Sequence, residues 1–189
     1  MFLNPGSRSA GSTGMPFDPL EHETPPEDLA ALDRLAELVG GSAAAVEVGS
    51  WVGSTALVLA KHFDRVYCVD TWEGTPSDSI GAVAARHGSA KVLDTFCANV
   101  GPRLLSTVVP IVGRSLDWAR RWPFQVNLIF LDADHDYEAV AADIRTWMPH
   151  VQTGGILCGH DWGWPGVTRA VGELVPGYRV DGTVWWAYV

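Results

Sequence analysis

Residues 126–137 read VNLIFLDADHDY, and this stretch decides the fold. A near-continuous apolar run, VNLIFLD, ends in an acidic segment and leads into a helical pattern over residues 136–150. Strands that are apolar along their length, with helices before and after them, are typical of parallel sheets covered on both faces. The stretch therefore predicts a central parallel strand whose carboxyl end carries charged side chains.

The alternation of strand and helix extends in both directions along the chain. Strands are expected at residues 43–48, 65–70, 107–112 and 156–159, and helices at about 27–38, 54–63, 80–99, 116–121 and 167–174. The tail YRVDGTVWWAYV predicts an antiparallel hairpin that turns at Asp181 and Gly182. The sequence thus predicts an α/β fold with a single doubly wound, Rossmann-like and mostly parallel seven-stranded sheet. We expect this domain over residues 27–189, after a flexible arm, rich in Gly, Ser and Pro, over residues 1–26.

The composition narrows the class of partner. The 189 residues carry a formal net charge of −9, and an acidic surface repels phosphate backbones and anionic lipids, so nucleic acid and membranes are not expected partners. Cys68 and Cys158 lie in apolar runs and no CxxC motif occurs, which favours reduced, structural thiols. No apolar stretch approaches the roughly 20 residues of a membrane helix, and the first residues lack the apolar core of a secretion signal. We expect a cytoplasmic protein with a small-molecule ligand.

The first expected strand runs into a turn that contains glycines. Residues 47–55 read EVGSWVGST, and Gly49 and Gly53 allow the backbone to turn sharply and to approach a ligand closely. In such sheets, ligands bind beyond the carboxyl ends of the strands, where free N–H groups of the next helix suit an anionic group. The same turn is also common as a plain connection between strand and helix.

Two acidic residues favour a particular ligand. Asp70 closes the second strand, 21 positions after Gly49, where its carboxylate can accept hydrogen bonds from both hydroxyls of a ribose; a capping role is the alternative. Glu47 would repel a pyrophosphate but suits the ammonium group of a methionine moiety, and the loop lacks the GxGxxG of dinucleotide sites. Together these residues favour S-adenosylmethionine over NAD.

Acidic side chains gather at the ends of the fourth and fifth strands, in the segments DADHDY and GHDW. Neighbouring parallel strands bring the two segments together, and close carboxylates repel one another unless a cation lies between them. Asp132, His160 and Asp161 are therefore candidate ligands of a divalent metal, Mg²⁺ or Mn²⁺, because hard ions prefer oxygen. Helix capping by Asp134 or Asp136 is the alternative use of these acids.

His135 lies within the first acidic segment and is the candidate general base. An imidazole titrates near neutral pH, and neighbouring carboxylates stabilise its charged form. Anchoring of its own loop is the alternative role. Trp162 and Trp164 follow the fifth strand and are candidate walls for an aromatic or sugar substrate, with a core role for at least one of them equally open.

Several segments together resemble a known family. In order, EVGSWVGSTALVLA, VYCVDTWEG, IVGRS, LIFLDADHDYEAVAADIRTWMPHVQTGGILCGHDW and PGVTRAV resemble the small class I methyltransferases around macrocin O-methyltransferase. Cephalosporin-hydroxylase-like proteins belong to this group, and catechol and caffeoyl-CoA O-methyltransferases are more distant relatives. The resemblance covers roughly residues 27–189, and residues 128–162 are its most specific part.

The resemblance implies roles for individual positions. The methionine portion of the cofactor would meet Glu47, Gly49, Trp51, Gly53 and Thr55, with Ser50 in the same loop, the ribose would meet Asp70, with Thr71 beside it, and the adenine would meet Ser115. Asp132 would border the cofactor and, with His160 and Asp161, match the metal positions, although better-studied relatives carry a carboxylate in place of His160. His135 matches the base proposed for some sugar O-methyltransferases.

The expected reaction is transfer of a methyl group from S-adenosylmethionine to a hydroxyl of a small molecule. The metal would lower the pKa of that hydroxyl, and His135 would take its proton beside Asp132. Sugar, polyketide, nucleoside and phenol acceptors stay open, with natural-product tailoring the leading guess by resemblance. A metal-independent methyltransferase, a non-catalytic cofactor-binding partner protein and, with less support, an NAD-dependent oxidoreductase are the alternatives. A homodimer in which the arm covers the pocket is also open.

Overall fold

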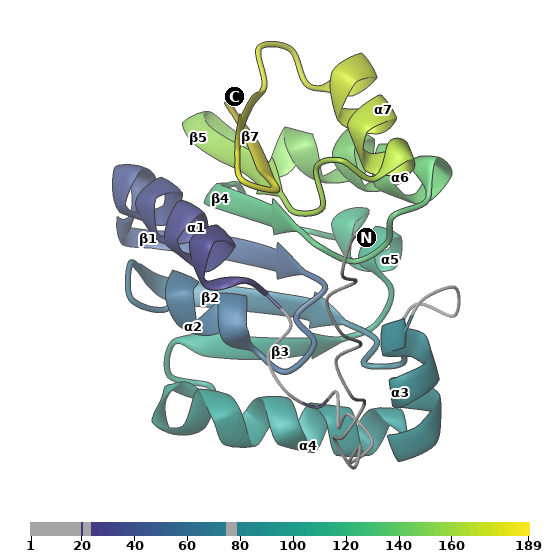
Figure 1. Cartoon of the computed structure of the whole chain (residues 1–189). Helices are drawn as coiled ribbons and strands as arrows, with labels where there is room; N and C mark the ends of the chain where they lie inside the picture. Colours follow the sequence, from purple (N-terminus) through teal and green to yellow (C-terminus); the bar gives the residue numbers. More distant parts are fainter. Residues whose placement is uncertain (1–19, 21–23, 75–78) are drawn as a thin grey trace, which may run out of the picture.

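A seven-stranded sheet forms the centre of the protein in a computed structural model, which describes residues 20, 24–74 and 79–189 (Figure 1). Its strands are β1 (Gly41–Val48), β2 (Phe63–Asp70), β3 (Val108–Val112), β4 (Val126–Leu131), β5 (Val151–Gly159), β6 (Arg179–Asp181) and β7 (Val184–Tyr188). They are ordered β3-β2-β1-β4-β5-β7-β6, with β1 to β5 parallel and β7 antiparallel to β5 and to β6. The predicted fold class is confirmed, including its antiparallel hairpin.

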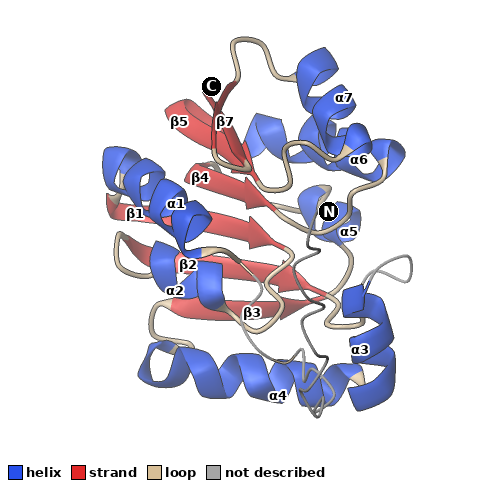
Figure 2. Cartoon of the chain, in the orientation of Figure 1, coloured by secondary structure: helices blue, strands red, loops and turns tan. Residues whose placement is uncertain are grey.

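Helices cover both faces of the sheet (Figure 2). They are α1 (Pro26–Val39), α2 (Ser54–Leu59), α3 (Ser79–His87), α4 (Ser89–Val100), α5 (Ser115–Ala119), α6 (Tyr137–Trp147) and α7 (Pro165–Leu174), and short 3-10 turns follow α4 (Gly101–Arg103) and α6 (Met148–His150). Helices α1 to α4 pack into one hydrophobic core, and α5, α6 and α7 pack into the other.

Strand β4 shows why its sequence is apolar along its length. Successive side chains of a strand point to opposite faces, and here both faces are covered. Leu128 and Phe130 lie in the core beneath α1 to α4, whereas Ile129 and Leu131 lie in the core beneath α5 to α7. The polar residues that follow β4 are therefore delivered to the carboxyl edge of the sheet.

Glycines account for two of the differences between observed and predicted boundaries. A third is helix α2, which was expected to reach residue 63 but ends at Leu59, because β2 already begins at Phe63. Strand β5 begins at Val151 instead of residue 156, and the glycines at 154 and 155 lie inside it, where its register against β4 shifts. A Cβ atom on Gly155 would lie 2.6 Å from the carbonyl oxygen of Asn127, so this glycine permits close strand contact. The helix expected over residues 80–99 is divided at Gly88, whose φ of 84° is unfavourable for other residues.

The arm predicted over residues 1–26 lies almost entirely outside the described residues, and α1 begins at Pro26. Among the described helices, none combines the length and the apolar character that crossing a membrane requires. Cys68 and Cys158 are buried and free, as predicted for structural thiols.

Candidate functional site

A cleft of about 650 Å³ opens at the carboxyl edge of the sheet, where the strand order reverses between β1 and β4. Its size is that of sites for small ligands, and its position is the one expected for a doubly wound sheet. Of the residues proposed from the sequence, the cleft is lined by Gly49, Ser50, Trp51, Gly53, Thr55, Asp70, Thr71, Ser115, Asp132, His135, His160 and Asp161. The fold thus brings these separate segments to one place.

Asp70 anchors the glycine-containing loop. Its Oδ2 atom accepts hydrogen bonds from the backbone N–H groups of Ser50 (2.8 Å) and Trp51 (3.0 Å), and its Oδ1 accepts one from the N–H of Trp72 (2.7 Å). These bonds hold Trp51 and Trp72 at φ 44° and 56°, a left-handed conformation that costs energy outside glycine. Asp70 is therefore a loop anchor at the wall of the cleft, and its contact with a ribose stays a prediction.

Glu47 is completely buried beneath the same loop and does not line the cleft. No hydrogen bond of good geometry reaches either of its carboxylate oxygens or the hydroxyl of Ser50 among the described residues. Burial raises the pKa of Glu47 to about 7, although the side chains of Ser50, Thr55 and Cys68 partly oppose this shift. A buried carboxylate without a good partner is costly, which suits a site that is completed by a positively charged ligand.

Gly49 brings the glycine-containing loop that follows β1 against the end of β4. A Cβ atom at this position, where φ is 86°, would lie 2.0 Å from the carbonyl oxygen of Asp132. The backbone N–H of Asp132 in turn donates to the carbonyl oxygen of Val48, at 2.8 Å. The loop that follows β1 and the acidic segment that follows β4 are thus in direct backbone contact.

Ser115 belongs to a buried network at the other end of the cleft. Its hydroxyl donates to Oδ1 of Asp143 (2.5 Å) and accepts from the indole N–H of Trp147 (2.8 Å). Burial raises the pKa of Asp143 to about 6, and the Ser115 bond opposes the shift. Asp143 also lines the cleft, but sequence reasoning missed it because a single acid within a helix carries no signal. Contact of Ser115 with adenine stays a prediction.

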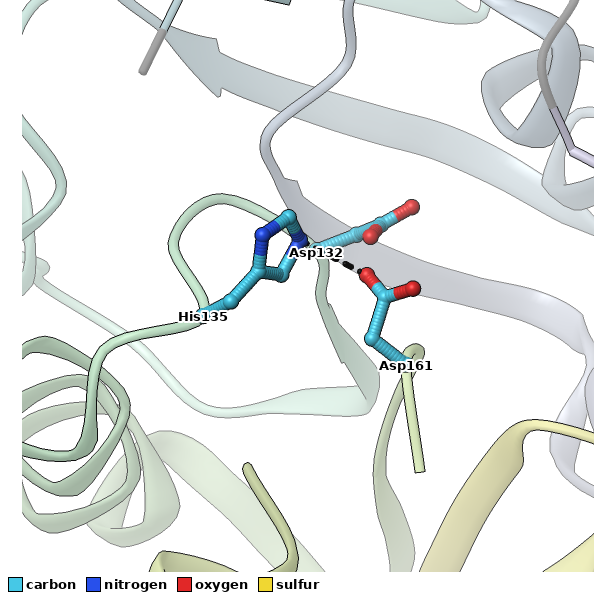
Figure 3. A group of neighbouring side chains, drawn as sticks. All are labelled: Asp132, His135 and Asp161. Atoms are coloured by element: carbon cyan, nitrogen blue, oxygen red, sulfur yellow. Dashed lines mark ion pairs between the residues drawn. The ribbon is translucent and has the colours of Figure 1, made fainter. Parts of the chain in front are cut away.

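Asp132 and His135, from the loop after β4, converge with Asp161, which follows β5, at the wall of the cleft (Figure 3). Nε2 of His135 lies 2.8 Å from Oδ2 of Asp161, and one ligand atom from each of the three residues lies within 4.8 Å of the others. Asp161 has φ 60°, so its backbone is held in a conformation that is rare for this residue type. These side chains are mostly buried, so their electrostatic interactions are stronger than in water.

His160 lies behind this group and is held between carboxylates. Its Nδ1 is 3.5 Å from Oδ1 of Asp132 and 3.4 Å from Oδ1 of Asp161. Burial alone would favour the neutral imidazole, but the hydrogen bonds and charges of these two carboxylates raise the pKa of His160 to about 11. A charged His160 therefore compensates part of the negative charge of Asp132 and Asp161. The same interactions, with that of His135, hold the pKa of Asp161 below its usual range despite burial.

Asp28 of α1 supports His160 from the far side and was missed by sequence reasoning. Its carboxylate accepts from the backbone N–H (3.0 Å) and the hydroxyl (2.8 Å) of Thr183, and its Oδ2 lies 3.2 Å from Nε2 of His160. In the sequence it is one of the acids expected in the first turn of a helix, so nothing marks it as a partner of a residue 132 positions away. Asp28 joins α1, the hairpin and the acidic cluster.

The donor set of the cluster fits a divalent cation. Carboxylate oxygens and imidazole nitrogens are both accepted by Mn²⁺ and related ions, whereas Mg²⁺ prefers oxygen alone. The group whose ligand atoms lie close together contains His135 instead of the predicted His160. An imidazole that binds a metal cannot also take a proton, so His135 can serve as a base only when it is not itself a ligand of the metal.

The two tryptophans after β5 differ in role. Trp162 packs on Tyr178, with ring centroids 4.9 Å apart, and joins the core beneath α5 to α7. Trp164 is 51% exposed, lines the cleft and lies with its ring 4.7 Å from that of His135, at an interplanar angle of 31°. Trp162 therefore has the core role that the sequence left open, and Trp164 forms a wall of the cleft.

Sequence comparison identifies the family to which this domain belongs. Residues 46–162, more than half of the chain, match a family model described as a methyltransferase domain. The match spans the glycine-containing loop, Asp70 and both acidic segments.

Solved structures with the same fold include enzymes with different acceptors. A Streptococcus mutans protein assigned as a methyltransferase and solved in complex with SAH is 10% identical, with a TM-score of 0.62 over 86% of this chain and 97% of that chain. CalS11, a TDP-rhamnose 3'-O-methyltransferase in calicheamicin biosynthesis, is 19% identical, with a TM-score of 0.58 over 85% and 78%. An rRNA methylase from Streptococcus thermophilus is 13% identical, with a TM-score of 0.58 over 87% and 96%. At these identities the likeness is one of fold.

Proposed function

The chain belongs to the family of methyltransferase domains, and we propose that it transfers the methyl group of S-adenosylmethionine to a hydroxyl group of a small molecule. One observation carries the proposal. His135, paired with Asp161 at 2.8 Å, shares a cleft with the loop around Gly49, and the backbone of that loop touches Asp132. A candidate base thus lies beside the loop expected to hold the cofactor.

Asp161 and His135 have different roles in removing the proton of the acceptor hydroxyl. Asp161 orients the imidazole of His135 and stabilises its charged form once a proton arrives. Because Nε2 of His135 donates to Asp161, the proton of the acceptor hydroxyl goes to Nδ1 of the same ring. The acceptor oxygen bonds to the methyl carbon, and the electron pair of the carbon–sulfur bond leaves with sulfur. Much of the rate would come from positioning, because effective molarities reach roughly 10⁵–10⁸ M in well-oriented systems.

The acidic cluster supports two versions of this reaction. A divalent cation, when bound by Asp132, His160 and Asp161, would lower the pKa of the acceptor hydroxyl. Metal-independent transfer is the second candidate, and one observation favours it: Nδ1 of His160 already lies 3.5 and 3.4 Å from the two carboxylates, where its charge compensates theirs. We place the chain, on its resemblance, in the subgroup around macrocin O-methyltransferase, with natural-product tailoring as its setting.

A labelled-methyl assay tests the proposal. Protein incubated with S-adenosylmethionine and a library of sugars, phenols, nucleosides and polyketides should transfer label to at least one hydroxyl, and His135→Gln should reduce that transfer at least about 100-fold. His62→Gln, at the opposite edge of the sheet, is the matched control. Binding of the cofactor without transfer to any library member would favour the non-catalytic alternative. Chelation followed by addition of Mn²⁺ or Mg²⁺ then separates the two versions.

A further inference from the structure

The charge and shape of the cleft around His135 restrict the class of acceptor. We infer that the acceptor is an uncharged or cationic molecule with a flat ring beside its reacting hydroxyl, and that anionic acceptors such as nucleotide sugars and RNA are rejected. This inference rests on the proposed function, because it assigns the open part of the same cleft to the acceptor.

Most of the charged side chains in the described lining of the cleft are carboxylates. They belong to Asp70, Glu73, Asp132, Asp134, Asp143 and Asp161. Among the described lining residues, Arg114 alone carries an arginine or lysine charge, and it adjoins Ser115, at the end expected to meet adenine. Around His135 and Trp164 the described cleft therefore has no cationic side chain apart from the histidines.

The negative charge persists when the cleft is loaded. S-adenosylmethionine brings one net positive charge and a divalent ion would bring two. With Arg114 these make four positive charges, against six lining carboxylates. Low-dielectric walls focus such a field, so an anion entering the cleft is repelled while a cation is attracted. The formal net charge of −9 on the whole chain acts in the same direction.

A tight turn after β5 supplies the flat surface. The N–H of Trp164 donates to the carbonyl oxygen of Asp161 at 3.0 Å, and the left-handed φ of Asp161 starts the turn. The turn sends Trp162 into the core and leaves half of Trp164 exposed in the cleft. Gly166 brings the loop of His135 against the first turn of α7, because a Cβ there would lie 2.2 Å from the carbonyl oxygen of His135. The aromatic wall and the base are thereby held side by side.

An aromatic wall next to a base suits a flat ring. Such a ring can stack on an indole, and a cationic group on the acceptor gains a further attraction from the same surface. The wall gives no compensation for the repulsion that an anion meets. The two features together favour neutral and cationic ring compounds.

A matched series of ligands tests the inference. The probes are tyrosol, tyramine and 4-hydroxyphenylacetate, which share a phenol ring and carry a neutral, a cationic and an anionic arm. Their binding to SAH-loaded protein is measured by saturation-transfer NMR and calorimetry. Tyrosol and tyramine should bind at least about tenfold more tightly than the carboxylate at low salt, and the difference should shrink as salt rises.

Matched variants assign the effect to the residues involved. Asp134→Asn, which removes one lining charge, should improve binding of 4-hydroxyphenylacetate about threefold to fivefold, while Asp64→Asn, at the opposite end of β2, should leave it unchanged. Trp164→Ala should weaken binding of all three probes about tenfold, and Trp164→Phe should restore most of the loss. Restoration by phenylalanine separates a ring contact from a general loss of folding.

The outcomes distinguish a failure of this inference from a failure of the proposed function. Failure of SAH itself to bind would overturn the proposed function. SAH binding together with equal or tighter binding of the carboxylate, or with no binding of any probe, would overturn the inference and leave the proposed function standing.

Discussion

Glu47 is the clearest case of a single residue that the fold holds at a cost. Its side chain is fully buried, and burial raises its pKa from 4.5 to about 7. Between these two values the folded protein keeps a proton that the unfolded chain has released, so stability falls as pH rises through this window. Above pH 7 the folded state contains a buried negative charge, at a cost of about 3 kcal/mol.

Glu47→Gln therefore changes the pH dependence of stability. Relative to the parent protein, the variant should gain stability as pH rises from 4.5 to 7, by up to about 3 kcal/mol, because glutamine has no proton to lose. Urea unfolding at pH 4.5, 6 and 8 measures the difference. Parallel curves for the two proteins across this range would contradict the assignment of the shift to Glu47. If Glu47 also meets the ammonium group of the cofactor, the same variant binds S-adenosylmethionine more weakly.

Asp70→Ala removes the anchor of the glycine-containing loop that follows β1. Three backbone N–H groups lose their acceptor, so we expect affinity for SAH to fall more than about tenfold. Titration calorimetry measures the loss, and Asp64→Ala on the same strand is the control. Unchanged affinity would show that neither the loop conformation nor a ribose contact depends on this carboxylate.

Part of the site could be predicted at the level of residues, and part could not. Asp132, His135, His160 and Asp161 follow apolar strands, so the carboxyl edge of a parallel sheet had to bring them together. Asp28 and Asp143 lie within helices, and their partners are fixed by packing of distant segments, which local sequence patterns do not encode. Glu47 was expected at the ligand, whereas the alternation of side chains along β1 places it beneath the loop.

Two glycines of α7 form a natural pair for a test of helix energetics. A Cβ on Gly172 meets open space, whereas one on Gly166 meets the backbone of the loop around His135 at 2.2 Å. Gly172→Ala should stabilise the protein by about 0.5–1 kcal/mol, because alanine has the higher helix propensity. Gly166→Ala should destabilise it and lower methyl transfer together. Chemical denaturation of both variants checks the signs, and equal effects at the two positions would refute the packing argument.

A buried carboxylate of helix α1, that of Asp28, joins this helix to the hairpin and to His160. Asp28→Ala leaves His160 and Thr183 without their shared partner, and breaking a buried pair of this kind costs about 3 kcal/mol. Thermal unfolding measures the loss. The control is Asp33→Ala on the same helix, which removes an exposed ion pair with Lys61 and should cost less than about 1 kcal/mol. A similar cost at both positions would mean that Asp28 contributes no more than a surface charge.

At the level of elements, periodicity and apolar runs were sufficient for most of the fold. The strands before and after each helix, and the hairpin at Asp181 and Gly182, were all expected. The start of β5 was wrong because paired glycines usually interrupt a strand, whereas here they permit a register shift against β4. The break at Gly88 was missed because a single glycine inside a helical pattern is often tolerated.

The formal net charge of the whole chain predicts that it does not bind RNA. With a formal net charge of −9, the chain should show no binding to a fluorescein-labelled 20-nucleotide RNA at 150 mM salt, at protein concentrations up to about 100 µM. Fluorescence anisotropy makes the measurement, with a basic RNA-binding protein as the positive control. Binding in the micromolar range would contradict the acidic-surface argument.

The missing side chain at Gly49 limits how this protein can diversify over generations. The ends of β1 and β4 meet there so closely that even a methyl group would collide with the Asp132 carbonyl. By contrast, a Cβ on Gly163, in the turn that presents Trp164, meets open space, and only the φ of 112° disfavours other residues there. Substitutions that adapt the protein to a new acceptor are therefore expected in the rim beyond β5, whereas a side chain at the junction of the two central strands should prevent correct folding.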